Sequence, residues 1–194
     1  MSLETYTPTD STEQPLSRAD VEKLLQEVES TDKLDLSSRN MRGIDLSELD
    51  LAGANLSCAN LIAANLSETN LSKANLSRAN LCGANLIAVN LSEADLSEAD
   101  LIGANCIVAN LTDANLILAN LTRAILLMTN LRGATLEKAI LHGAFMSRAN
   151  LLDTNLEQAI LSGTILKDAY LYEPDKASLA DRGIIDLDKV RIVT

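Results

Sequence analysis

Aromatic residues are almost absent from this chain of 194 residues, which has one Phe, three Tyr and no Trp. Aromatic rings contribute much of the buried area in ordinary protein cores. A chain with so few rings needs a slim interior filled by small and aliphatic side chains. We therefore expect a single elongated domain rather than two globular ones.

Residues that carry catalysis or bind metals are equally scarce. His142 is the only histidine, and no Ser or Cys nucleophile is arranged with it in the sequence. The three cysteines lack the CxxC spacing of zinc and redox sites. We expect Cys58 and Cys82 to point outward and Cys106 to lie in the core. The sequence therefore predicts no enzyme activity, no cofactor and no metal, with His142 as a solvated surface residue.

Glycine-rich phosphate loops are also missing. Five of the glycines recur at intervals of 20 residues or multiples of 20: Gly43, Gly83, Gly103, Gly143 and Gly163. A column of this kind indicates turn geometry rather than nucleotide binding.

Long apolar runs are absent too. No run approaches the 18 residues of a transmembrane helix. The first residues, MSLETYTPTDSTEQPLS, lack the basic start and apolar stretch of a signal peptide. These features predict a cytoplasmic protein with no membrane partner.

What the sequence has in abundance is a repeat of five residues. From Leu36 to Leu171 every fifth position holds Leu or a substitute, which gives 28 consecutive units. The substitutes are Met41, Cys106 and Met146. Ala usually stands two residues before the Leu, with Asn or Asp between them, as in Ala54-Asn55-Leu56. Helices bury residues at a period of 3.6 and strands at a period of 2, so the chain must turn a corner in every unit, with Ala and Leu inside.

Such a unit cannot bury its Leu alone. Stacked turns, about 4.8 Å apart, would bury each Leu between those of the turns above and below. The bare layer at each end would then need a cap. The repeat thus predicts an all-β solenoid.

The units Ala54–Cys58 (ANLSC) and Ala74–Arg78 (ANLSR) strongly resemble the pentapeptide-repeat protein family. The resemblance covers residues 34–173. It implies a right-handed quadrilateral parallel β-helix with four units, or 20 residues, in each turn. On that basis, residues 34–173 form about seven coils.

The N-terminal end predicts an arm followed by a cap. Residues 1–15 are polar, with two prolines, and are typical of a disordered arm. Ser17-Arg18-Ala19-Asp20 matches a capping box, and Val21, Leu24, Leu25 and Val28 then form one apolar stripe. We expect a helix over about 18–31, within a capping segment of residues 16–33. A partner-binding role for the stripe is an alternative.

The C-terminal end predicts a second cap over residues 174–194. Pro174-Asp175 is a helix-start signal, so that a helix would continue over Lys176–Arg182 and stop at Gly183. Residues 184–193 are rich in β-branched side chains, which favour a strand. This helix/strand tail is too apolar for a solvated arm and should fold onto the coil or onto a second chain.

The net charge of −11 bears on possible partners. Direct binding to nucleic acid is disfavoured because phosphate contacts need clustered Lys and Arg. The resemblance raises a different option, since some pentapeptide-repeat proteins mimic duplex DNA and bind DNA gyrase, including those that protect gyrase from quinolones. Those members commonly carry central Phe residues and interrupting loops, whereas Phe145 is not central and this repeat is unbroken. Basic residues are also interspersed along the coil: Lys73, Arg78, Arg123, Arg132, Lys138 and Arg148.

The outward positions hold an apolar patch. Sorted by a period of 20, its members fall on the side centred on residues 46, 66, 86 and so on, and on the side before it. They are Ile62, Ile87, Ile102, Ile107, Val108, Ile125, Leu127, Met128, Ile140, Phe145, Ile160 and Ile165. A contiguous patch of this kind indicates a covered or binding surface. The C-terminal tail within one chain, a second copy of the chain or another protein could cover it.

These features favour a non-enzymatic scaffold or regulator that contacts other proteins. A gyrase-directed DNA mimic is the alternative, and catalysis is a distant third. The interpretation as a scaffold rests partly on analogy, because fold alone does not determine function.

Overall fold

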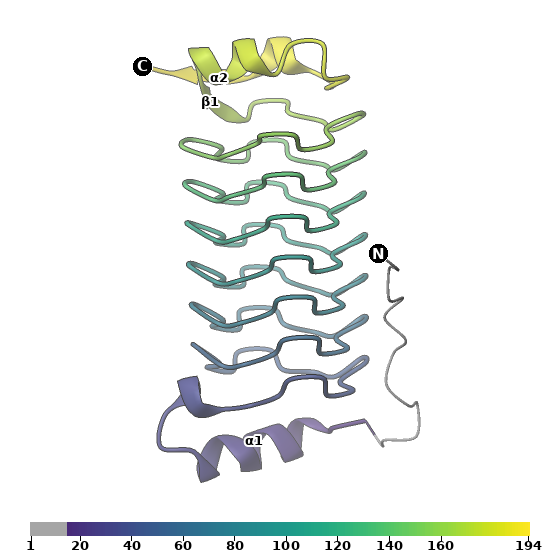
Figure 1. Ribbon diagram of the computed structural model, residues 1–194, viewed down its shortest axis with the longest axis vertical. Coiled ribbons are helices and arrows are strands. Elements are labelled where there is room, and N and C mark those ends of the chain that lie inside the picture. Colours follow the sequence, from purple (N-terminus) through teal and green to yellow (C-terminus); the bar gives the residue numbers. More distant parts are fainter. Residues whose placement is uncertain (1–14) are drawn as a thin grey trace, which may run out of the picture.

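The computed structural model describes residues 15–194, which form a straight rod of stacked turns with a helix across each end (Figure 1). Parallel β-bridges join residues of the Asn columns to the residues 20 positions later, without a gap from Asp35↔Asn55 to Asn150↔Tyr170, and again at Ile165↔Ile185. One turn of the coil therefore takes four five-residue units. The predicted disordered arm, residues 1–15, lies outside the described residues except for Pro15.

The bridges fall into four columns, which define four sides. We number the sides by their first central residue: side 1 from Leu36, side 2 from Met41, side 3 from Leu46 and side 4 from Leu51. Each side continues every 20 residues along the rod.

Most of the sheet structure consists of isolated bridges, because each unit is straight for only a few residues before the next corner. The backbone N–H and C=O groups of neighbouring turns nevertheless form hydrogen bonds with each other. The N–H of Leu96 donates to the C=O of Asn115 at 2.7 Å, and the N–H of Glu98 donates to the C=O of Ile117 at 2.9 Å. Paired polar groups of this kind let the chain pass close to an apolar core at low cost.

The interior is the predicted stack of Leu and Ala. Leu96 and the neighbours above and below it, Leu76 and Leu116, are fully buried. Cys106 is also fully buried, as predicted for a residue in a Leu position. Thr129 replaces Ala in the second inward column, and its hydroxyl donates to the C=O of Cys106 at 2.7 Å. The core therefore tolerates a polar atom where a backbone carbonyl accepts its proton.

The corner of each unit has a regular backbone geometry. The Asn or Asp side chain accepts from the N–H two residues on, as Asp95 Oδ1 accepts from Ser97 at 2.9 Å, which is an Asx-turn. The fifth residue of the unit then adopts a left-handed conformation, with φ of 57° at Glu98 and 56° at Val108. β-branched residues rarely adopt this conformation, so Val108 is a strained position.

The Asn side chains also form ladders along the rod. Asn65 Nδ2 donates to Asp45 Oδ1 at 3.0 Å, and Asn85 Nδ2 donates to Asn65 Oδ1 at 2.9 Å. Asp35, Asp45 and Asp50 stand in the first turn, where no turn below could accept from an amide. A carboxylate only accepts, so Asp suits the start of a ladder.

Helix α1 (Arg18–Glu27) lies across the first turn of the coil (Figure 1). Its predicted capping box is present, because Ser17 N–H donates to Asp20 Oδ2 at 2.8 Å and Asp20 N–H donates to Ser17 Oγ at 3.3 Å. Val21 is fully buried against the core. The expected end at residue 31 is wrong: the backbone is extended at Val28, and Thr31–Lys33 form a separate 3₁₀ turn, η1. Residues 29–32, Glu-Ser-Thr-Asp, include types that compete with helix by local hydrogen bonding.

The other end of the rod closes with strand β1 (Tyr170–Tyr172), helix α2 (Glu173–Ser178), the 3₁₀ turn η2 (Leu187–Lys189) and strand β2 (Arg191–Val193). The strands pair in parallel, and α2 lies across the last turn (Figure 1).

The helix predicted to start at Pro174-Asp175 and continue to Arg182 is shorter in the structure. It begins at Glu173 and ends at Ser178, because Leu179 turns inward and becomes buried. Beyond it, the tail begins a further partial turn. Ile185 N–H donates to the C=O of Thr164 at 2.8 Å, and Arg191 N–H donates to the C=O of Ala169 at 2.7 Å.

Candidate interaction surface

The only histidine has a partner that the sequence does not reveal. His142 Nδ1 lies 2.8 Å from Ser162 Oγ, one turn further along an exposed corner. Among residues 15–194, no hydrogen-bonded carboxylate orients the other nitrogen of His142. A base that activates a Ser nucleophile is usually oriented by a third group, so the arrangement resembles a surface hydrogen bond more than a catalytic pair.

Two of the three thiols, those of Cys82 and Cys106, are poor nucleophiles. Burial raises the pKa of Cys106 to about 12. Burial, followed by a hydrogen bond to Asp100, raises the pKa of Cys82 to about 11. The reactive form of cysteine is the thiolate, which these values disfavour at neutral pH. Within the part of the chain that the structure describes, no three His, Cys, Asp or Glu residues form a cluster that could hold a metal ion.

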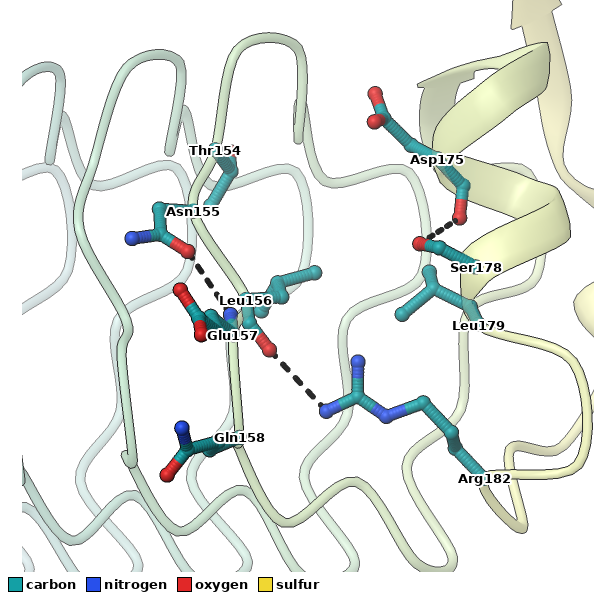
Figure 2. A pocket seen from close by; sticks show the side chains of 9 residues that line it. All are labelled: Thr154, Asn155, Leu156, Glu157, Gln158, Asp175, Ser178, Leu179 and Arg182. Carbon is teal, nitrogen blue, oxygen red and sulfur yellow. Dashed lines mark hydrogen bonds between the residues drawn. The ribbon is translucent and has the colours of Figure 1, made fainter.

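A cavity of about 400 Å³ lies between α2 and the last unit of side 1 (Figure 2). Arg182 reaches from beyond α2 and donates through Nη2 to the carbonyls of Leu156, at 3.1 Å, and Ala159, at 2.5 Å. In the middle of the rod the carbonyl equivalent to that of Ala159 accepts from the next turn, as that of Ala79 does from Asp100 N–H at 2.9 Å. Arg182 thus substitutes for a missing turn, and its guanidinium is occupied by this capping role.

The apolar patch lies on sides 2 and 3 and on the corner that follows side 3. Two columns of the patch are joined by bridges: Ile125↔Phe145↔Ile165 on side 3 and Ile140↔Ile160 on side 2. Ile62 lies apart, two turns from Ile102, because Cys82 occupies the same column between them.

Five members of the patch are exposed, and the other seven are half-buried. The exposed members are Ile102, Val108, Met128, Phe145 and Ile160, at 40%, 49%, 51%, 43% and 50%. The half-buried members lie in the same or adjacent columns, so that the exposed side chains are continuous with apolar neighbours.

The expectation that the C-terminal tail covers this patch is wrong for most of it. The tail packs on the end of the rod and extends the side 3 column only at Ile165↔Ile185. It leaves Met128 and Phe145 exposed on the long side of the rod. The tail is a continuation of the coil, so Ile184, Leu187 and Val190 pack against the end of the core instead of folding back along a side.

Three exposed apolar residues lie outside the predicted patch, and one of them, Ile192, is at the end of the tail. Leu118, exposed by 51%, lies on the corner after side 1, away from the patch. Ile185, exposed by 48%, extends the patch to the tail. Their positions in the 20-residue period could have identified both.

None of the helices in the described part of the chain is long and apolar enough to cross a membrane.

Comparison with known proteins gives a family and a fold. The family model described as pentapeptide repeats matches residues 34–67, 59–97, 90–126 and 129–168. A solved structure of HetL, described as a pentapeptide-repeat protein involved in heterocyst differentiation regulation from the cyanobacterium Nostoc sp. strain PCC 7120, is 35% identical, with a TM-score of 0.60. That match covers 71% of this chain and 68% of HetL. Among curated proteins, no sequence matches this chain.

A second solved structure is that of QnrB1, described as a plasmid-mediated fluoroquinolone resistance protein, in the form of a trypsin-treated variant. It is 20% identical over 80% of this chain and 79% of QnrB1, with a TM-score of 0.71. At this identity the likeness concerns the fold alone. Pentapeptide-repeat proteins form right-handed quadrilateral β-helices, and the four bridge columns of this chain agree with that architecture.

Proposed function

Because this chain belongs to the pentapeptide-repeat family, we propose that it is a non-enzymatic scaffold or regulator that acts by binding another protein. The binding surface in this proposal is the apolar patch on sides 2 and 3 and on the corner that follows side 3. The proposal treats residues 34–173 as about seven coils, with caps formed by residues 16–33 and 174–194.

The observation that carries the proposal is the position of the exposed apolar residues. Over most of the rod the outward positions hold Asn, Ser, Glu or Lys, whereas Val108, Met128 and Phe145 lie exposed in neighbouring turns. Contiguous exposed apolar patches on soluble proteins mark binding sites more often than isolated residues do. HetL is described as taking part in regulation, which is consistent with a role that needs contact without catalysis.

A pair of matched variants tests this role. Met128→Ser removes an apolar side chain from the patch, and Leu118→Ser removes one that is equally exposed, at 51%, from the corner after side 1. In affinity capture from the native host with quantitative mass spectrometry, Met128→Ser should lose bound proteins that the wild-type chain and Leu118→Ser retain. Equal capture by all three proteins would contradict the proposal.

Gyrase binding is the second candidate, supported by the net charge of −11 and the fold shared with QnrB1. Ion pairs between neighbouring turns of the rod argue against gyrase binding. Lys73 lies 3.7 Å from Glu93 on the next turn, and Arg78 lies 3.7 Å from Glu98. Such pairs interrupt the negative columns that a mimic of DNA would need.

A supercoiling assay separates the two candidates. We expect no inhibition of gyrase and no relief of quinolone inhibition at micromolar concentrations of this protein. A salt-sensitive effect on gyrase, lost when Asp95, Glu98 and Asp113 are neutralised, would reverse this ranking.

A further inference from the structure

The corner after side 3 forms a ridge along the rod, which we call the corner ridge. In five successive turns it holds Ser67-Glu68, Ile87-Ala88, Ile107-Val108, Leu127-Met128 and Ser147-Arg148. Hydrogen bonds stack these pairs directly: the N–H of Val108 donates to the C=O of Leu127, and the N–H of Met128 to the C=O of Ser147, each at 3.0 Å. The ridge is therefore a continuous, regularly spaced row of side chains.

The ridge has an acid at one end and a base at the other. Glu68 and Arg148 are both exposed, and among residues 15–194 neither has an oppositely charged group within 4.0 Å. Charged residues on the other corners do pair between turns, as Arg132 does with Asp153 at 3.1 Å. Within residues 15–194, the charges at the two ends of the corner ridge therefore have no ion-pair partner in their own chain.

The order of side chains along the ridge is nearly palindromic. Ile107-Val108 stands at the centre, apolar pairs lie one turn away on both sides, and a serine with a charged residue lies two turns away on both sides. Consider a second copy that runs antiparallel and is related to the first by a two-fold axis at Val108. Each ridge residue would then face a residue of the same column in the second copy, at the same number of turns on the other side of Val108. Ile87 would then face Leu127, and Glu68 would face Arg148, twice in one interface.

The opposite arrangement is unfavourable. Two parallel copies in register would place Glu68 against Glu68 and Arg148 against Arg148, and like charges across an interface are costly. The charges therefore select the antiparallel orientation.

The outermost turns place like charges opposite each other. By the same rule Glu48, one turn beyond Glu68, would face Asp168 of the second copy, with Lys167 next to it. Asp168 already has a partner in its own chain, because Arg191 Nε lies 3.5 Å from it. Lys167 is exposed and remains available for Glu48.

The length of the ridge suits a stable contact. With the outermost turns on each side of the ridge included, the seven turns from Glu48 to Lys167 span about 29 Å at ~4.8 Å between turns, which matches one dimension of a standard interface. A standard interface buries roughly 800 Å² on each partner, which corresponds to a square of about 28 Å.

Val108 at the centre provides a separate argument. It keeps a β-branched side chain at φ 56° while remaining 49% exposed. Strain of this kind at an exposed position gives the single chain little packing in return, and strained residues cluster at functional sites. A contact across the two-fold axis would bury this side chain.

The geometry points to an antiparallel homodimer that forms through the corner ridge, with two reciprocal Glu68–Arg148 ion pairs around an apolar centre at Val108. This inference rests on the proposed function in that the ridge carries five members of the apolar patch, namely Ile87, Ile107, Val108, Leu127 and Met128, and it identifies the partner as a second copy of the chain.

Charge reversal tests the register. The full-length chain should sediment as a dimer in analytical ultracentrifugation. Glu68→Arg and Arg148→Glu should each weaken dimerisation by about tenfold or more, because each places two like-charged pairs in the interface. The double variant E68R/R148E should restore dimerisation to near the wild-type level.

Arg123→Glu is the matched control. Arg123 is an exposed residue at the same corner position on side 2, outside the ridge, and its reversal changes the net charge as Arg148→Glu does. It should leave dimerisation unchanged, and circular dichroism should confirm that all variants keep the fold.

A wild-type chain that stays monomeric at several hundred micromolar would overturn the homodimer. Failure of E68R/R148E to restore dimerisation would overturn the antiparallel register and with it the inference. The two proposals can fail independently. If the chain is monomeric but its capture of another protein still depends on Met128, the homodimer is wrong and the proposed function stands.

Discussion

The inside and the outside of the rod follow different rules. Leu96 and Leu116 occupy equivalent inward positions in neighbouring turns and are equally buried. The residues that follow them, Ser97 and Ile117, also occupy equivalent positions but differ completely in chemistry. Two inward positions in each unit therefore maintain the core, whereas the outward position after the Leu varies and can carry the binding properties of the surface.

The same contrast appears along the outward Asn columns. On side 3, Asn65 and Asn85 form a hydrogen-bonded ladder, whereas Ile125, Phe145 and Ile165 continue that column with apolar side chains. The backbone bridges persist without interruption across the change. The ladder therefore supports the fold but is not required in every turn, which allows an apolar surface to replace it.

The largest effect should come from an inward substitution. Leu96→Ala should lower the free energy of unfolding by about 2–5 kcal/mol, through lost burial and the cavity left between Leu76 and Leu116. Leu118→Ser on the outside should change it by less than about 0.5 kcal/mol. Chemical denaturation of both variants checks the contrast, and a more damaging Leu118→Ser would contradict the assignment of inside and outside.

Most of the coil could be predicted from the sequence because one five-residue rule is repeated along it. The buried positions of Leu96 and Cys106 follow from the period alone. The four sides do not, since five residues for each corner are compatible with other numbers of corners, and the number came from the family resemblance.

Contacts between turns were harder to predict. The hydrogen bond between His142 and Ser162 joins residues 20 positions apart, so it becomes visible only when the length of a turn is known. The same holds for Glu68 and Arg148, which belong to one ridge although 80 residues separate them. The exact ends of α1 and α2 depend on how Val28 and Leu179 meet the core, which local propensity does not determine.

A smaller effect, of opposite sign, should come from Val108. Val108→Asn should raise the free energy of unfolding by about 1 kcal/mol, because Asn tolerates the left-handed conformation that strains a β-branched residue. Denaturation at low protein concentration measures this gain without the contribution of self-association. Arg123→Asn, at the same corner position on side 2 and with φ of 56°, should gain less because Arg is not β-branched. A loss of stability in Val108→Asn would mean that Val108 packs usefully within its own chain.

The smallest effect should be a pH dependence at the first turn. Hydrogen bonds from the side chain and then the backbone of Ser47, together with the nearby charge of Arg18, lower the pKa of Asp45 from 3.8. A folded-state pKa below the unfolded value stabilises the fold above about pH 4, and that stabilisation is lost as the pH falls through the folded-state pKa. Asp45→Asn keeps an acceptor oxygen but removes the charge, so it should be slightly less stable than the wild type at pH 7, and the stabilities of the two proteins should converge below about pH 4.

Urea denaturation between about pH 3 and pH 7 measures the difference in stability, and Glu48→Gln controls for the loss of one negative charge in the same turn. A difference between wild type and Asp45→Asn that grows as the pH falls would show that the carboxylate of Asp45 is destabilising, and the explanation given for Asp at the start of the ladders would then be wrong.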